Sequence, residues 1–191
     1  MRLEYKIVFL DYWHLSSGLS AGAKLDSTVV KDRDNLPYAS GKTLKGLARE
    51  MAELLNDKLL ILKCFGGEGV DMGVCYFSNA TLQKEVADEI KEHSLQDRLY
   101  DEIASTKIGK EDRFDKEGKQ IEKKGIAVDN SLREIEVVVP ITLEGYIDDV
   151  PSDFTENMIK TLTMIKRMGL NRNRGLGRCE ITVEEVEKCE N

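Results

Sequence analysis

The sequence has 191 residues, of which 41% are hydrophobic, so it is long enough for one domain with a substantial core but short for two independent domains. Its net charge of −7 excludes a protein that is basic over its whole surface. No apolar run is long enough to span a membrane, and we expect a soluble cytoplasmic protein with no membrane partner.

The first predicted element is a strand at residues 3–9, where apolar and charged side chains alternate. A loop over residues 12–40 follows, in which glycine and serine interrupt any periodic pattern. Loops of this length inside a domain are commonly functional, and this one carries Asp26 between Lys24 and Lys31. Two interpretations are open for Asp26: an acid that these lysines neutralise, or an acid of a functional site.

A helix is predicted to begin near Ser40 or Thr43, either of which can cap its first turn. Its apolar positions lie on one face, and a second stripe is basic, formed by Lys42, Lys45 and Arg49. The stripe begins at the helix N-terminus, where backbone N–H groups favour anions. It is either a solvated surface or a phosphate-binding one.

Residues 74–77 are predicted to form a second strand, and residues 81–104 a weak amphipathic helix or a partly ordered connection. Residues 105–130 contain too few apolar side chains to form a core of their own. Residues 116–119, Lys-Glu-Gly-Lys, are predicted to be the tip of a hairpin.

Alternating apolar residues predict one continuous strand over residues 135–147. Pro151 then introduces a second helix, for which Asp153 and Glu156 are predicted to form a capping box and Ile165 to end the buried stripe. Residues 181–183 are predicted to close the domain as a last strand.

A glycine-rich loop, residues 168–178 (MGLNRNRGLGR), lies between that helix and the last strand. Its glycines let a backbone approach a ligand closely, and its arginines are spaced to flank one: Gly169, Arg172, Arg174, Gly175 and Gly177. Residues 165–178 hold five basic residues and no acidic one, which favours anion binding over a simple turn.

The order of elements predicts an α+β, ferredoxin-like fold: a four-stranded antiparallel sheet with two helices on one face. We predict a single domain over residues 1–191, with residues 81–130 inserted as a thumb-like hairpin region. The topology is also that of the RNA-recognition motif, but aromatic residues for base stacking are sparse, so RNA would be held by loops. Both basic stretches are expected on one side of the fold.

Two stretches carry a family resemblance: residues 18–50 (GLSAGAKLDSTVVKDRDNLPYASGKTLKGLARE) and the glycine-rich loop at residues 168–178. Together they resemble the RAMP-superfamily backbone subunits of type III CRISPR effector complexes, which serve antiviral defence. The resemblance implies binding of guide RNA (crRNA) and target RNA, and assembly with other copies of the chain and other effector subunits. It also implies that the hairpin separates nucleotides of the guide–target duplex.

The resemblance further implies that Asp26 carries cleavage of the target RNA, with Mg²⁺ or Mn²⁺ bound by Asp26, RNA phosphate and water. Lys42, Lys45 and Arg49, with the loop residues Gly169, Arg172, Arg174, Gly175 and Gly177, are the implied contacts to RNA. Three alternatives are open: a non-cleaving structural subunit, a guide-processing endoribonuclease with His14 as general base, or a generic RNA-binding protein.

Overall fold

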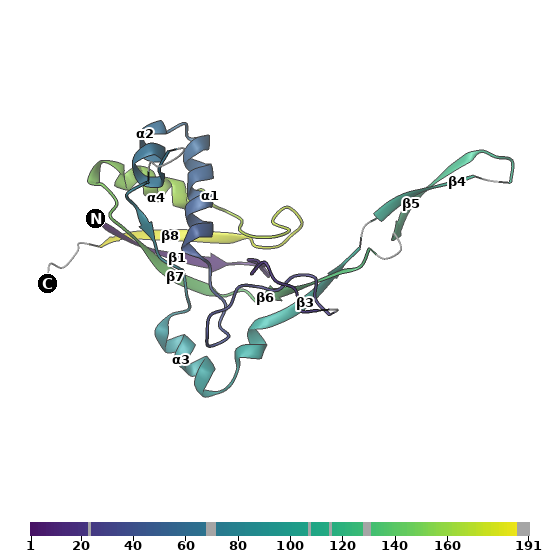
Figure 1. Ribbon diagram of the computed structural model, residues 1–191, viewed down its shortest axis with the longest axis horizontal. Helices are drawn as coiled ribbons and strands as arrows, with labels where there is room; N and C mark the ends of the chain where they lie inside the picture. The colour runs from purple at the N-terminus through teal and green to yellow at the C-terminus, as the bar shows by residue number, and fades with distance from the viewer. Residues whose placement is uncertain (23, 68–71, 107, 115, 128–130, 187–191) are drawn as a thin grey trace.

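The computed structural model describes residues 1–22, 24–67, 72–106, 108–114, 116–127 and 131–186, and it has the predicted α+β fold (Figure 1). Four antiparallel strands form the main sheet in the order β2-β7-β1-β8. Their bounds are Arg2–Phe9 for β1, Tyr76–Phe77 for β2, Thr142–Asp148 for β7 and Cys179–Val186 for β8. With one helix after β1 and another after β7, this is the ferredoxin-like arrangement.

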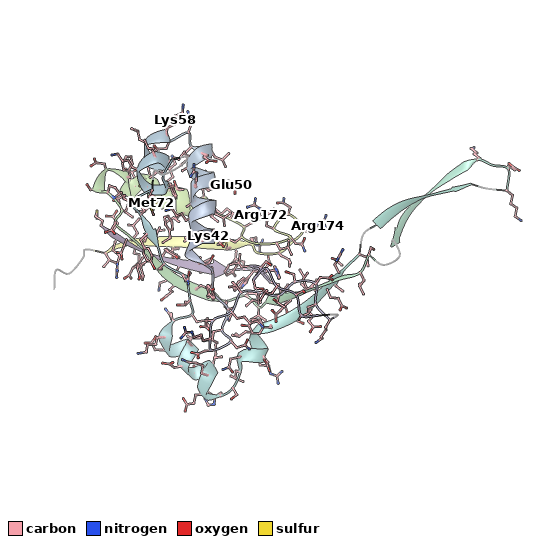
Figure 2. The ribbon with its side chains drawn as sticks, viewed as in Figure 1. Lys42, Glu50, Lys58, Met72, Arg172 and Arg174 are labelled. Carbon is pink, nitrogen blue, oxygen red and sulfur yellow. The ribbon has the colours of Figure 1, made fainter. Side chains whose placement is uncertain are left out.

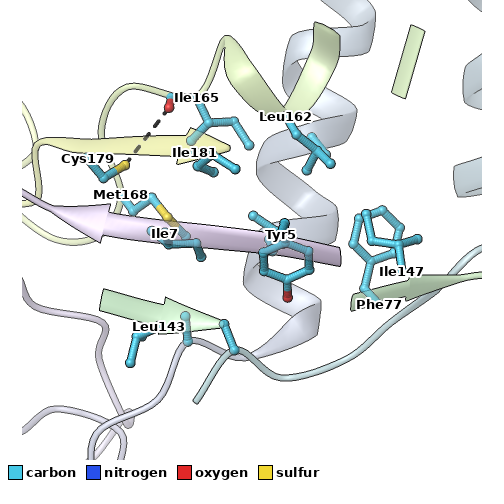
Figure 3. Packing of buried hydrophobic residues seen from close by; sticks show 14 of the residues in the cluster. Tyr5, Ile7, Phe77, Leu143, Ile147, Leu162, Ile165, Met168, Cys179 and Ile181 are labelled. Carbon is cyan, nitrogen blue, oxygen red and sulfur yellow. Dashed lines mark hydrogen bonds between the residues drawn. The ribbon is translucent and has the colours of Figure 1, made fainter. Parts of the chain in front are cut away.

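Two helices, α1 (Gly41–Leu54) and α4 (Thr155–Thr163), cover one face of the sheet and contact each other (Figure 1). The core lies between them and the inward side chains of the strands, among them Tyr5, Ile7 and Leu143 (Figure 3). Ser40 caps α1 by accepting a hydrogen bond from the backbone of Thr43, as predicted. Two short helical turns follow α1, namely α2 (Lys58–Leu60) and η1 (Ile61–Phe65).

The other face of the sheet is uncovered and polar, with Glu4 and Lys6 exposed between the buried positions of β1. On this face, the guanidinium of Arg2 covers the aromatic ring of Tyr146, at 4.2 Å from the ring centroid. The expectation that bases are not stacked on the sheet stays a prediction.

A hairpin projects from the body of the fold (Figure 1). β4 (Ile108–Phe114) pairs with β5 (Gln120–Ala127), and the turn between them contains residues 116–119, as predicted. At its base, β3 (Tyr100–Ser105) pairs with β6 (Arg133–Val138). Residues 81–104 are more ordered than expected, because they hold α3 (Lys84–Glu92), the turn η2 (Gln96–Leu99) and most of β3. The division into one domain with an insertion stays a prediction.

Two local predictions were wrong. The strand expected over residues 135–147 is two strands, β6 and β7, in different sheets, because Pro140 lacks an N–H and the chain bends there. The capping box is not formed either: the helix is entered through a 3₁₀ turn, η3 (Ser152–Phe154), and the cap position is Phe154, without a side-chain bond. Ile165 is buried, as expected, but lies beyond the end of α4.

In the part of the chain that the structure describes, every helix is too short or too polar to cross a lipid bilayer.

Candidate functional site

The loop that carries Asp26 is docked along β6, the strand by which the chain returns from the hairpin. The backbone N–H of Asp26 donates to the carbonyl of Glu134 at 2.8 Å, and that of Glu136 donates to the carbonyl of Ser27 at 3.0 Å. Ser27 thereby pairs with Ile135 in parallel. Because the loop is held as an extra strand segment, the position of Asp26 is tied to the base of the hairpin.

Both carboxylate oxygens of Asp26 accept hydrogen bonds. Oδ1 accepts from Nη1 of Arg133 at 2.8 Å, and Oδ2 accepts from the backbone N–H of Glu134 at 2.9 Å. These two donors, the backbone N–H first, lower the pKa of Asp26 below its usual range. The side chain is 38% exposed, so an ionised carboxylate faces solvent beside the hairpin.

The expected lysine neighbours of Asp26 pair elsewhere. The ammonium of Lys24 lies 2.6 Å from Glu102, and that of Lys31 lies 2.7 Å from Glu136. The cation beside Asp26 is instead Arg133, 107 positions later in the chain. The interpretation in which Lys24 and Lys31 neutralise Asp26 was therefore wrong, since the ion pair comes from β6.

His14 is fully buried beneath this loop. One ring nitrogen, Nδ1, faces the carbonyl of Glu136, which can only accept, so Nδ1 carries the proton. The other, Nε2, is 3.0 Å from the hydroxyl of Ser27. With both nitrogens engaged and no exposed surface, His14 anchors the loop and is not positioned to act directly on a substrate.

Glu136 fixes the next part of the loop from the same strand. Its carboxylate accepts from the backbone N–H of Val29 at 2.9 Å and from Lys31 at 2.7 Å, and its side chain is only 11% exposed. Removal of one partner from a buried ion pair leaves the other charge uncompensated.

Glu136→Ala is therefore expected to lower the free energy of unfolding by about 3 kcal/mol and to speed amide exchange at Val29. Urea unfolding and hydrogen–deuterium exchange measure both effects. Glu102→Ala is the matched control, because its bridge to Lys24 is exposed and is expected to contribute at most about 1 kcal/mol. Equal losses from the two variants would contradict a special role for Glu136.

The groups around Asp26 that the structure describes do not form a suitable binding site for a divalent metal ion. Both its oxygens are already bonded, and the guanidinium of Arg133 repels a metal ion from the oxygen that it contacts. Magnesium and manganese prefer several oxygen ligands, and no group of three potential metal-binding side chains occurs among the described residues. Binding of Mg²⁺ or Mn²⁺ stays a prediction.

The basic stripe of α1 is divided between two environments. Lys42 is exposed, whereas Lys45 donates to the carbonyl of Cys75 at 3.4 Å and Arg49 to Glu53 and to the carbonyl of Gly66. Lys45 and Arg49 thus contact carbonyl groups of the protein's own backbone, Lys45 next to β2 and Arg49 at the end of η1. Of the three predicted RNA contacts on the helix, Lys42 is the one that projects freely.

The glycine-rich loop lies beside α1, where Arg172 is 3.5 Å from Glu50 (Figure 2). Figure 2 shows Arg174 further out on the same loop, and Arg174 is exposed. A groove of about 320 Å³ separates the loop from the helix, and its lining includes Lys166, Arg167 and Arg172. The prediction omitted Lys166 and Arg167, although the acid-free stretch 165–178 contains both.

The glycines of this loop have different roles. A Cβ on Gly169 would lie 2.2 Å from the carbonyl oxygen of His14, and one on Gly177 would lie 1.9 Å from that of Met168. A Cβ on Gly175 would meet nothing within 4 Å. The close approach at Gly169 and Gly177 is therefore to the protein's own backbone, and Gly175 is the glycine open to a ligand.

The glycine-rich loop contacts the short segment that leads into the first motif, which places the two motifs close together, as expected. The backbone N–H of Leu170 donates to the carbonyl of His14 at 2.9 Å, and that of Gly177 donates to the carbonyl of Tyr12 at 2.7 Å. His14 in turn contacts Ser27, next to Asp26. The basic loop and Asp26 are thus joined through one short segment, residues 12–15, and whether this surface binds RNA stays a prediction.

Comparison with known proteins agrees with this arrangement. The family model of the RAMP superfamily matches residues 6–180. A chain of the type III-B Cmr-beta complex bound to cognate target RNA has a TM-score of 0.67 at 12% identity, over 96% of this chain and 97% of that one. A chain of the apo Cmr-beta complex has a TM-score of 0.66 at 12% identity, over 97% of this chain and 98% of that one. The crystal structure of Cmr4 has a TM-score of 0.54 at 15% identity, over 98% of this chain and 100% of that one. No curated protein matches in sequence.

Proposed function

Because this chain belongs to the RAMP superfamily, we propose that it is a backbone subunit of a cytoplasmic type III CRISPR effector complex. In this role it would bind crRNA and cleave complementary target RNA, with Asp26 as the catalytic residue. The observation that carries the proposal is the ionised carboxylate of Asp26, held by β6 at the base of the projecting hairpin. The fold shared with chains of Cmr-beta, which is described as bound to cognate target RNA, supports the same assignment.

The guide would lie along the basic side of the fold. Lys42 and Arg174 are exposed cations there, and Arg172, which pairs with Glu50, is half-buried. Contacts from such cations to phosphates hold a nucleic acid without reading its sequence. Gly175 leaves space for the RNA backbone. Lys45 and Arg49 would take part only after leaving the carbonyl groups that they contact in this structure.

Asp26 would accept a hydrogen bond from the 2′-hydroxyl of the target nucleotide and aim it at the adjacent phosphorus. The 2′-oxygen forms a bond to phosphorus while the bond to the 5′-oxygen breaks, leaving a 2′,3′-cyclic phosphate. The 2′ proton passes to Asp26 or to water, and the 5′-oxygen takes a proton from water. Because both oxygens of Asp26 are already bonded, the predicted divalent ion would be held mainly by RNA phosphate and water.

The test is cleavage of a labelled RNA complementary to the guide in the assembled complex, with magnesium or manganese and with a chelator. Cuts at regular intervals, one for each copy of the chain, are the expected result. An uncut target with the guide bound along its length would favour the structural subunit. Binding of RNA by the monomer alone would favour a generic RNA-binding protein, and cleavage of the guide precursor would favour the processing enzyme, against which the burial of His14 argues.

A further inference from the structure

We infer that Arg133 is a second catalytic residue, which contacts a non-bridging oxygen of the scissile phosphate while it remains bonded to Asp26. The inference rests on the proposed cleavage at Asp26 and extends it to a residue on another element. Arg133 is the first residue of β6, the strand by which the chain returns from the hairpin. It lies in neither of the two motifs that mark this chain as a RAMP protein.

The contact geometry leaves Arg133 able to bind a second group. Its Nη1 lies 2.8 Å from Oδ1 of Asp26, and this is its one recorded partner among the described residues. A guanidinium has five N–H donors in a planar fork, so the bond to Asp26 uses only part of its capacity. The side chain is 62% exposed, on the same surface as Asp26. A phosphate that reaches Asp26 therefore also reaches free donors of Arg133.

The charges at the site favour such a contact. A lone carboxylate repels the phosphodiester that it must approach, and negative charge on the phosphate increases as the 2′-oxygen attacks. The two lysines that flank Asp26 in the sequence do not offset this charge where they lie, because Lys24 is paired with Glu102 and Lys31 with Glu136. Among the described residues, the side chains around Asp26 do not provide enough ligands for a metal ion. Arg133 supplies the positive charge at that position, and arginine matches the geometry of phosphate oxygens.

Asp26 keeps its place without Arg133. The backbone N–H of Glu134 still donates to Oδ2, and the backbone of Asp26 still donates to the carbonyl of Glu134. Arg133→Ala is therefore expected to fold, to assemble and to keep the carboxylate near its present position. The variant removes a hydrogen-bond donor to the substrate but keeps the backbone bonds that hold Asp26.

The experiment measures single-turnover cleavage of target RNA by the reconstituted complex. Arg133→Ala is expected to cut about 10²- to 10³-fold more slowly than the native chain, with guide and target binding unchanged. Arg133→Lys is expected to recover part of the loss, since it restores charge without the planar fork. Arg2→Ala is the matched control, because Arg2 forms a similar bridge with Asp148 on the main sheet and is expected to leave the rate unchanged.

A second readout separates contact with the phosphate from support of Asp26. A single sulfur in place of a non-bridging oxygen at the cut site weakens a hydrogen bond there. The native complex is expected to be slowed by one of the two sulfur stereoisomers, and Arg133→Ala is expected to be slowed much less. An equal sulfur effect in both, or no sulfur effect in the native complex, would overturn the inference.

Failure of this inference and failure of the proposed function give different results. An inactive Asp26→Ala complex beside an Arg133→Ala complex of native rate would overturn the role of Arg133 alone. An Asp26→Ala complex that cuts at the native rate would overturn the proposed function, and with it the inference.

Discussion

Asp26→Ala is expected to abolish target cleavage in the assembled complex, reducing the rate by about 10³-fold or more, within the range of 10²–10⁴ for loss of a positioned acid or base. The reason is that the low pKa of Asp26 keeps its carboxylate ionised, as an acceptor for the 2′-hydroxyl. Single-turnover assays with a labelled target measure the effect. Asp26→Asn keeps the shape of the side chain and is expected to be nearly as inactive.

Asp34→Asn is the control for this prediction. Asp34 belongs to the same loop and is also exposed, but its carboxylate pairs with Lys91 at 3.5 Å, on α3. We expect native cleavage from this variant and native guide binding from all three. Loss of assembly in Asp26→Ala, instead of loss of cleavage alone, would show that Asp26 stabilises the loop through Arg133 and Glu134 and would remove its catalytic assignment.

The sequence predicted most reliably the elements whose pattern is local. The alternation in β1 and the cap of α1 at Ser40 each depend on residues within one turn or one strand, and both were confirmed. Prediction failed where the environment changes along the chain. Val137 and Val138 are both fully buried, so β6 does not keep one face in solvent, and the apparent alternation across Pro140 joined two different strands.

The site was predicted only in part, because a sequence pattern identifies neighbours along the chain and not neighbours in space. Asp26 was recognised in a motif, but its neighbours were taken from nearby positions, Lys24 and Lys31, whereas the side chain that contacts it is Arg133 on β6. Nothing in residues 12–50 indicates that the loop runs beside β6, because that contact depends on the backbone pairing of Ser27 with Ile135. Long-range ion pairs of this kind follow from topology and not from spacing.

Gly177→Ala is expected to lower the free energy of unfolding by about 4 kcal/mol, near the upper limit for single substitutions. Gly177 has a φ of +69°, which costs about 1 kcal/mol or more for a residue with a Cβ. The added methyl group would also lie 1.9 Å from the carbonyl oxygen of Met168, in a buried turn whose backbone is tied to Tyr12. Thermal unfolding of the purified chain should show a fall in Tm of about 10 °C.

Gly175→Ala is the matched control, since its φ is +91° but a Cβ there meets no atom within 4 Å. It carries only the conformational cost, so we expect a loss of about 1 kcal/mol and a fall in Tm of about 3 °C. The two variants also separate packing from ligand contact. Weaker binding of RNA is expected from Gly175→Ala at nearly native stability, because the open glycine faces the proposed path of the guide. If Gly177→Ala instead lost RNA affinity while keeping its Tm, Gly177 would be a ligand contact, and the close approach to Met168 would not be what requires glycine there.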